Sequence, residues 1–369
     1  MSSTTILLTG GNGFIAVHTV VLLLQRGYTI TTTVRSEAKT AYLRKRFSDA
    51  VGSGQLKLAI VQDITVPGAF DEVLKNNTFD AVIHTSSPVV FEAKDVERDI
   101  LVPAIQGTTK ILKAVKVHAS TVKRVVVTSS AVAILDLSKG ARPGYVYDEK
   151  DWNPVGNPHI VSNTFKALMT GFNQLTFEQA QENARFGYAG SKIYAEKAAW
   201  EFMDIEKPSF DLVTICPPMV YGPVIQEVTS MASLNLSSKK FYAMFSGQEK
   251  ELSPDVFWLW VDVRDVAEAH VAAIEKPEAG GQRFFVTAGS FNVAQVVRYI
   301  WEHYPERALA KGIPKDTSNV EYPPGGFYTA DNSASKRVLE LEYRPLETML
   351  KDQLDQFLVL EKEIESSNN

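Results

Sequence analysis

A glycine-rich turn that directly follows an apolar strand constrains this chain more than any other feature. Residues 4–9 are apolar or β-branched, and apolar residues then recur with helical periodicity from Phe14 to Gln25, where Gly27 ends the pattern. The residues of the turn and of the first helical positions are Gly10, Gly11, Asn12, Gly13, Phe14, Ile15 and Ala16. Gly10 permits a tight turn, and Gly13 lets the backbone approach a pyrophosphate at the helix N-terminus. The segment therefore predicts a dinucleotide-binding turn.

Strand and helix signals alternate through the first third of the chain. We expect further strands over residues 29–34, 57–61, 81–84 and 124–128, and a helix over 99–117. The segment 124–128 is mostly valine, as in strands that are buried on both faces. Strands that alternate with helices form a parallel sheet covered on both sides. The pattern predicts an α/β fold with a doubly wound parallel Rossmann sheet.

A tyrosine and a lysine four residues apart supply the candidate chemistry. Tyr188 and Lys192 share one face if their segment is helical. Free tyrosine has a pKa near ~10, so a cation such as Lys192 is needed to draw that pKa toward neutrality. Ser130, after the strand 124–128, would polarise a substrate carbonyl, and Ser129 is the alternative because successive strand residues point to opposite faces. With the glycine turn, these residues predict hydride transfer from a nicotinamide cofactor, with Tyr188 as proton donor and Lys192 also on the ribose.

The end of the second predicted strand favours NADP(H) over NAD. An acidic residue at this position would bind a ribose 2′-hydroxyl, whereas this chain has Arg35 there and Lys39 four residues later. Arg35 can form a fork on a 2′-phosphate and Lys39 can add a point charge. Asp63 and Ile64 follow the third strand, where we expect the carboxylate to accept from the adenine and Ile64 to pack on it.

Composition excludes several other classes of function. The chain has 369 residues, a net charge of -5 and one cysteine, with a sequence pI of about 5.8. The acidic balance argues against nucleic acid or an anionic membrane as a partner. Cys216 as the lone cysteine fits a reducing compartment, and with no visible signal peptide we expect a cytoplasmic protein. Six scattered histidines show no metal-site spacing, so we expect no metal.

Motifs along nearly the whole length resemble one branch of a known family. They are the segments 9–16, 34–36, 84–88, 127–131, 148–153, 188–192, 198–202, 217 with 221–223, and 261–267. Together they are similar to those of extended short-chain dehydrogenase/reductases. The likeness is greatest to fungal aldehyde, carbonyl and methylglyoxal reductases and to their plant relatives, the dihydroflavonol and cinnamoyl-CoA reductases.

The resemblance implies site residues and a division of the chain. It implies a catalytic set that falls on Ser130, Tyr188 and Lys192. It also implies cofactor contacts that spacing alone does not predict. These fall on Thr85, Pro217, Val220 and Ser237. The Rossmann domain would span residues 1–221 with a returning segment around 257–275, and residues 222–369 would form mainly a smaller α/β substrate lobe.

These features favour NADPH-dependent reduction of aldehydes or ketones to alcohols by a monomer or homodimer, with a small carbonyl compound as substrate. The alternatives are an NAD-dependent nucleotide-sugar epimerase or dehydratase and a non-catalytic NADP-binding redox sensor. Arg35 and Lys39 count against the first, and the Tyr188–Lys192 pair counts against the second. The aromatic segment 155–175 is either a cover over the substrate pocket or an insertion without a role, and 176–185 has the spacing of a capped short helix.

Overall fold

The computed structural model describes residues 4–87, 97–154, 184–255 and 257–368. A seven-stranded sheet in the order β10-β7-β5-β4-β1-β2-β3 organises the larger part of the molecule, and all its strand pairs are parallel. Its strands are β1 (Thr5–Thr9), β2 (Thr29–Val34), β3 (Leu56–Ile60), β4 (Ala81–His84), β5 (Arg124–Thr128), β7 (Asp211–Cys216) and β10 (Arg283–Phe285). The strand order reverses direction between β1 and β4, where open α/β sheets bind their ligands.

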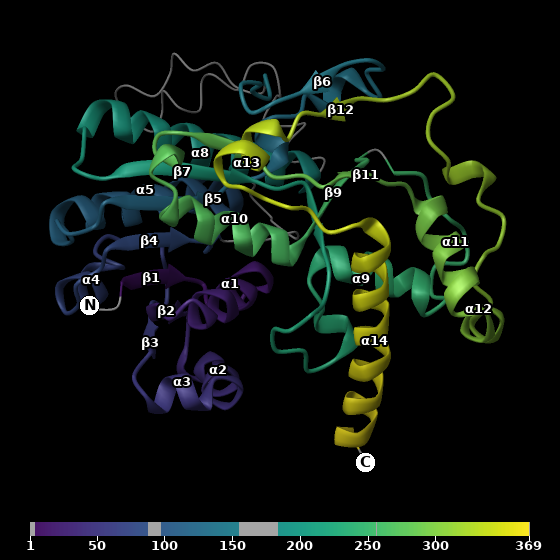
Figure 1. The fold of residues 1–369 in the computed structure, drawn as a ribbon, viewed down its shortest axis with the longest axis horizontal. Helices are drawn as coiled ribbons and strands as arrows, with labels where there is room; N and C mark the ends of the chain where they lie inside the picture. Colours follow the sequence, from purple (N-terminus) through teal and green to yellow (C-terminus); the bar gives the residue numbers. More distant parts are fainter. Residues whose placement is uncertain (1–3, 88–96, 155–183, 256, 369) are drawn as a thin grey trace.

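Helices cover both faces of this sheet (Figure 1). On one face α1 packs against α10, and on the other α5 packs against α8. The bounds are α1 (Phe14–Gln25), α2 (Thr40–Arg46), α3 (Ser48–Gly52), α4 (Asp71–Lys75), α5 (Val102–His118), α8 (Ala184–Glu206) and α10 (Val263–Glu275). A π-helical turn, η2 (Glu97–Leu101), precedes α5. The apolar faces of these helices bury the sheet from both sides, which confirms the predicted doubly wound α/β fold.

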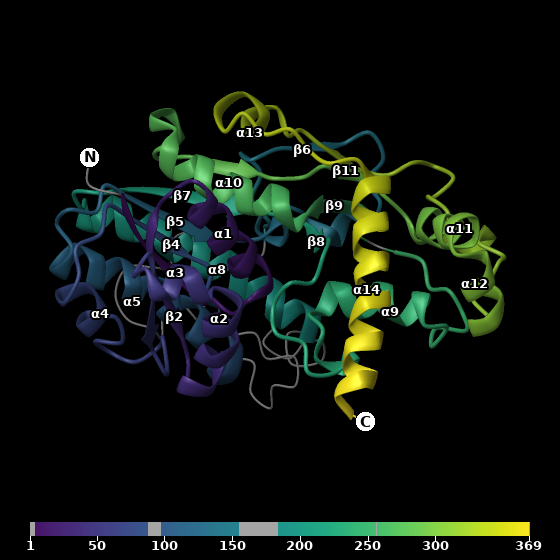
Figure 2. The ribbon, with the colours of Figure 1, turned by 60° about the horizontal axis from the view of Figure 1, so that its bottom comes forward.

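A smaller lobe is built largely from the C-terminal part of the chain. Its core joins β8 to the helices α9, α11 and α14, and Figure 2 shows α14 standing alongside α9. The helices are α9 (Leu236–Phe245), α11 (Val293–His303), α12 (Pro305–Lys311), α13 (Ser333–Val338) and α14 (Leu346–Asn368). Two small sheets complete the structure, with strands β8 (Met219–Tyr221), β9 (Leu259–Asp262) and β11 (Gly289–Ser290) in one, and β6 (Val146–Tyr147) and β12 (Thr329–Ala330) in the other.

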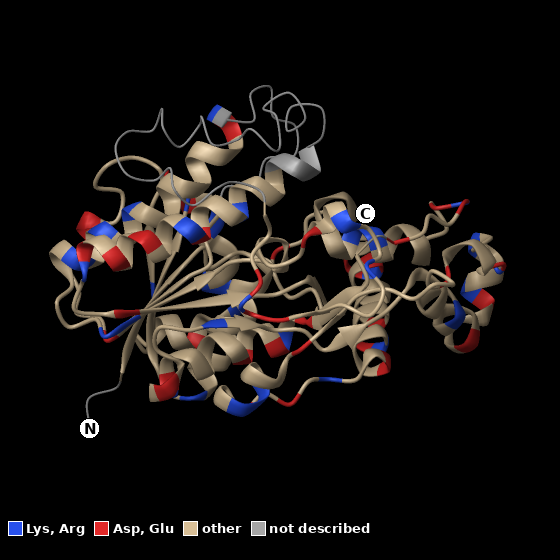
Figure 3. Cartoon of the chain, turned by 90° about the horizontal axis from the view of Figure 1, so that it is seen from above, with Lys and Arg blue, Asp and Glu red and all other residues tan. Residues whose placement is uncertain are grey.

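Short 3₁₀ turns connect these elements. They are η1 (Glu37–Lys39), η3 (Ala131–Ala133), η4 (Leu137–Lys139), η6 (Met231–Ser233), η7 (Pro277–Ala279) and η8 (Ser318–Val320). Basic and acidic residues are interspersed along the helices (Figure 3). Within the described ranges, the longest helices are too polar to cross a bilayer.

The predicted elements of the first third agree closely with the structure. The helix 14–25 and the strands 29–34, 81–84 and 124–128 are confirmed with the same bounds, and the strand expected at 57–61 lies one residue earlier. The helix expected from residue 99 becomes regular only at Val102, after η2. The segment 155–175 and most of the capped helix expected at 176–185 lie outside the described residues.

Candidate active site

The glycine turn after β1 leaves no room for side chains at its first two glycines. Gly10 has a φ of 76°, in the left-handed region that favours glycine. A Cβ on Gly10 would lie 2.7 Å from Ser86 Oγ, and one on Gly11 would collide with the side chain of Thr32. The turn is closed by a hydrogen bond of 2.9 Å from Gly13 N–H to the Gly10 carbonyl. Glycine is therefore required here by packing as well as by conformation.

The N-terminus of α1 presents free backbone donors. The first intrahelical hydrogen bond runs over 3.0 Å from Val17 N–H to the carbonyl of Gly13, the N-cap residue. The amides of Phe14, Ile15 and Ala16 consequently have no acceptor in the described part of the chain. Free amides at a positive helix end suit the pyrophosphate of a dinucleotide. The turn thus fits NADP(H) on its own geometry.

The two cations predicted to bind phosphate lie near each other, but only one of them forms an ion pair with another described residue. Arg35 follows β2 with an exposed side chain, and it forms no ion pair with another described residue. Lys39, in η1, places its Nζ 3.1 Å from Glu227 Oε2. Both cations therefore stand at the end of β2 that the prediction requires, but Lys39 already has an acidic partner.

The expected adenine residues lie after β3. Asp63 Oδ1 accepts hydrogen bonds from Thr65 N–H at 2.8 Å and from Thr65 Oγ1 at 2.6 Å. These bonds hold the pKa of the exposed Asp63 carboxyl below its ordinary value. Ile64 is half-buried against the core beneath α5. The carboxylate is thus ionised and ordered by its own turn.

Of the cofactor contacts implied by resemblance, Thr85 and Pro217 follow strands β4 and β7, Val220 lies in β8 and Ser237 lies in the first turn of α9. Thr85 Oγ1 donates to the Thr9 carbonyl at 2.6 Å, next to the glycine turn. The Pro217 carbonyl accepts from Ala131 N–H at 2.8 Å. Ser237 Oγ donates to the Val220 carbonyl at 2.5 Å and so ties α9 to β8.

Ser130, Tyr188 and Lys192 are brought together. Ser130 follows β5 and caps η3, where its Oγ accepts from Val132 N–H at 3.3 Å. The same side chain hydrogen-bonds to Tyr188. Lys192, one turn further along α8, has its Nζ 6.0 Å from the centre of the Tyr188 ring.

Burial dominates the ionisation of this pair. It raises the pKa of Tyr188 above 10.0, and the hydrogen bond with Ser130 opposes the rise. Burial also lowers the pKa of Lys192 to about 8, with Glu196 opposing the fall. The expected lowering of the tyrosine pKa by Lys192 is not seen in this structure, where desolvation has the largest effect on that pKa. Tyr188 is therefore protonated at neutral pH.

Sequence reasoning missed a buried carboxylate directly below the site. Glu196 is 1% exposed and accepts from Ser129 Oγ at 2.5 Å, Thr214 Oγ1 at 2.8 Å and Arg283 Nε at 2.7 Å. Burial favours its protonated form, but Arg283 and the two hydroxyls outweigh burial and hold the pKa of Glu196 below its ordinary value. An acid four residues after Lys192, on the same helix face, was the available signal.

A second polar group buried near Lys192 is a histidine. His84, 2% exposed, accepts or donates at Nδ1 to Thr9 Oγ1 over 2.9 Å, while its Nε2 has no partner among the described residues. Burial, with a contribution from Lys192, lowers the pKa of His84 to about 3, so the ring is neutral. The side chains of His84 and Lys192 line one small cavity, together with Glu196 and Thr108.

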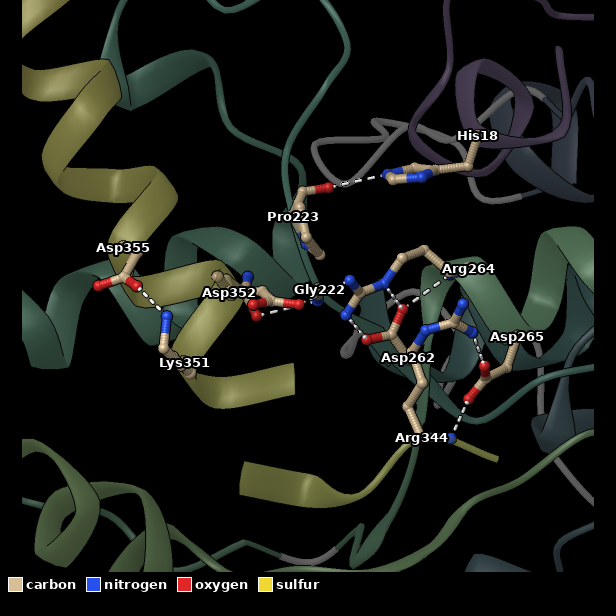
Figure 4. Close-up of polar contacts among 11 residues, drawn as sticks. His18, Gly222, Pro223, Asp262, Arg264, Asp265, Arg344, Lys351, Asp352 and Asp355 are labelled. Carbon is tan, nitrogen blue, oxygen red and sulfur yellow. Dashed lines mark hydrogen bonds and ion pairs between the residues drawn. The ribbon is translucent and has the colours of Figure 1, made fainter. Parts of the chain in front are cut away.

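Polar contacts join the two lobes (Figure 4). Asp262 caps α10 by accepting from Arg264 N–H at 2.8 Å, and the Arg264 guanidinium bridges Asp262 and Asp352 of α14. His18 of α1 donates from Nε2 to the Pro223 carbonyl at 2.9 Å. Burial lowers the pKa of His18 to about 4, so this contact uses a neutral ring. In the described residues, no cluster of His, Cys, Asp or Glu is arranged to hold a metal ion.

Comparison with known proteins agrees with this arrangement. The family model described as "NAD dependent epimerase/dehydratase family" matches residues 6–151 and 168–294. The chain is 37% identical to the ketoreductase azaE of Aspergillus niger, over 96% of this chain and 97% of that protein. It is 33% identical to the NADPH-dependent methylglyoxal reductase GRE2 of Saccharomyces cerevisiae, over 98% of this chain and 100% of the other.

Solved structures show the same relationship. The yeast methylglyoxal/isovaleraldehyde reductase Gre2 in complex with NADPH superposes with a TM-score of 0.82 at 32% identity, covering 97% of this chain and 99% of the other. A UDP-glucose 4-epimerase from Thermotoga maritima, at 19% identity and a TM-score of 0.68, shares the fold.

Proposed function

Because this chain belongs to the NAD dependent epimerase/dehydratase family, as an extended short-chain dehydrogenase/reductase, we propose that it reduces aldehydes or ketones to alcohols with NADPH. The observation that carries the proposal is the hydrogen bond between Ser130 and Tyr188, with Lys192 one helical turn away. Relatives over nearly the whole chain are named as NADPH-dependent reductases, which supports the choice of cofactor.

The chain's own residues would hold the cofactor in three places. The amides of α1 and the glycine turn would hold the pyrophosphate. Arg35 and Lys39 would hold the 2′-phosphate, and Lys192 would bind the nicotinamide ribose. Bound NADPH supplies the hydride that reduces the carbonyl carbon.

Tyr188 and Ser130 would act on the carbonyl oxygen. Ser130 would donate a hydrogen bond that polarises it, and Tyr188 would transfer its phenolic proton as negative charge develops there. Burial keeps Tyr188 protonated until that moment. Lys192 would then stabilise the tyrosinate, since its charge lies within about one helical turn of the ring.

The epimerase alternative has less support from the site. The solved epimerases on the same fold are only 19% identical to this chain, and the exposed Arg35 at the end of β2 favours a 2′-phosphate. Tightly bound NAD in the purified protein would instead favour an epimerase.

The test is NADPH consumption with a panel of aldehydes, α-dicarbonyls, aryl ketones and β-ketoesters. We expect turnover with at least one class and formation of the matching alcohol. Turnover that is faster with NADH than with NADPH, or binding of NADPH without reduction of any carbonyl, would contradict the proposal.

A further inference from the structure

A short connection after β8 fastens the smaller lobe to the edge that would bind the cofactor. This segment, residues 222–227, is called the strap below. Its Pro223 carbonyl accepts from His18 of α1 at 2.9 Å (Figure 4). Its Ile225 carbonyl accepts from Tyr42 of α2 at 2.7 Å. Figures 1 and 2 both show the chain after β8 passing beside α1 and α2.

The strap is anchored independently of its acidic end. Ile225 packs against the buried side chains of Val17, Val34 and Leu43, which come from α1, β2 and α2. With the two backbone contacts, this packing fixes the course of the strap. Glu227 is therefore presented to the end of β2 by the backbone that precedes it, and its position does not depend on the ion pair that it makes.

The strap runs between the two ends of the expected cofactor. It leaves β8 just after Val220, the residue expected beside the nicotinamide. It ends at Glu227, whose carboxylate lies 3.1 Å from the Nζ of Lys39, the cation expected on the 2′-phosphate. Lys39 is thus paired with an acid in the protein alone, whereas the neighbouring Arg35 is exposed.

A ligand phosphate has to compete with this carboxylate. An ammonium group that is already paired offers less net charge to a second anion, and a carboxylate beside a phosphate repels it. We propose that Glu227 tunes cofactor selectivity by holding Lys39 in the free protein and yielding it to the 2′-phosphate of NADPH. The proposal rests on the function proposed above and names a residue that opposes binding at the same site.

The expected size of the effect follows from the exposure of the pair. The side chains of Lys39 and Glu227 are 45% and 30% exposed, so the ion pair contributes little free energy. A competing anion that breaks the pair therefore loses only a small factor in its affinity. Loss of the carboxylate raises the fraction of the protein in which Lys39 is available to the 2′-phosphate. NADPH binding should therefore tighten about two- to fivefold. NADH lacks the 2′-phosphate, so its affinity should stay the same.

The experiment is a fluorescence titration of the purified protein with NADPH and with NADH, in the absence of substrate. The variants are Glu227→Gln, Lys39→Gln and the double variant. The matched control is Glu340→Gln, which removes the same charge from another exposed ion pair. Glu340 pairs with Lys276, the residue that follows α10. Thermal unfolding of each variant verifies that the strap remains folded.

We expect Glu227→Gln to tighten NADPH alone and Glu340→Gln to change neither cofactor. Lys39→Gln should weaken NADPH, and adding Glu227→Gln to it should tighten NADPH by a smaller factor than the same change does in the wild-type protein, because only the direct repulsion is then removed. Weaker or unchanged NADPH binding in Glu227→Gln, with Lys39→Gln weakened as expected, would overturn the role of Glu227 and leave the proposed function standing. An unchanged Lys39→Gln would overturn the placement of the phosphate and this proposal together. A wild-type protein that binds no NADPH would overturn the proposed function itself.

Discussion

Ser129 and Ser130 are neighbours in the chain, but their hydroxyls belong to different networks. Ser129 Oγ donates to Glu196 at 2.5 Å below the sheet edge, whereas Ser130 hydrogen-bonds to Tyr188. The alternation of side chains at the end of β5 separates a group that orders the scaffold from one that would face the carbonyl in the proposed reaction.

This separation predicts opposite phenotypes for two alanine variants. Ser130→Ala should lower kcat about 10- to 100-fold with little loss of stability, because it removes a donor to the developing oxyanion. Ser129→Ala should cost about 1–3 kcal/mol of stability, because it removes the shortest hydrogen bond to a buried carboxylate oxygen of Glu196. Steady-state kinetics and denaturant unfolding measure the two quantities. The reverse pattern would mean that Ser129 is the polarising residue.

The tyrosine can be tested without disturbing the fold. Tyr188→Phe removes only the phenolic oxygen, so turnover should fall about 10²- to 10⁴-fold while NADPH still binds. Kinetics with the best carbonyl substrate and a direct NADPH titration measure both. Full activity in this variant would exclude Tyr188 as the proton donor.

The basic limb of the activity profile should report Lys192. The pKa of Lys192 is lowered by burial to about 8, so its charge is present below that pH and lost as the pH rises through it. If the charge stabilises the tyrosinate, kcat should decline above about pH 8. In Lys192→Arg, whose guanidinium stays charged, any remaining activity should lack that decline. An identical limb in both proteins would assign it to another group.

The buried ion pair of Glu196 and Arg283 should matter chiefly for stability. Their side chains are 0% and 9% exposed, so Glu196→Gln leaves a buried guanidinium without its counter-charge and should cost about 3–5 kcal/mol. The matched control is Glu321→Gln, since Glu321 pairs with Arg298 at the surface with 41% and 55% of the side chains exposed, and should cost less than about 1 kcal/mol. Equal losses of stability for the two variants in thermal unfolding would show that the buried pair stabilises the protein no more than the exposed pair does.

How far the sequence predicts this molecule depends on the range of the interactions. Strands rich in β-branched or apolar residues, such as β2, β4 and β5, are specified by their own residues, and so is α1, which ends at Gln25 just before Gly27. β10 has only three residues, and nothing local marks it as a strand of the main sheet. It lies beyond the returning segment that we expected around 257–275.

The residues of the site also differ in whether local or long-range contacts determine them. The Tyr188–Lys192 pair is local to one helix and can be read from spacing. The partner of Glu196 is Arg283, 87 residues away, and the orphan Nε2 of His84 depends on what packs around it. The partner of Lys39 is 188 residues away. Such contacts are set by the tertiary fold, so periodicity does not reveal them.

The pairing of β10 with β7 has a consequence for synthesis on the ribosome. β7 pairs with β5 on one side and with β10 on the other. A nascent chain that ends before Arg283 would therefore expose an open strand edge, a template for pairing with other chains, and would hold Glu196 without its cation. Much of the smaller lobe, including β8 and α9, emerges before that edge is closed. Translation must thus pass about three quarters of the message before the nucleotide-binding half can be completed, and until then the β7 edge stays open to other chains.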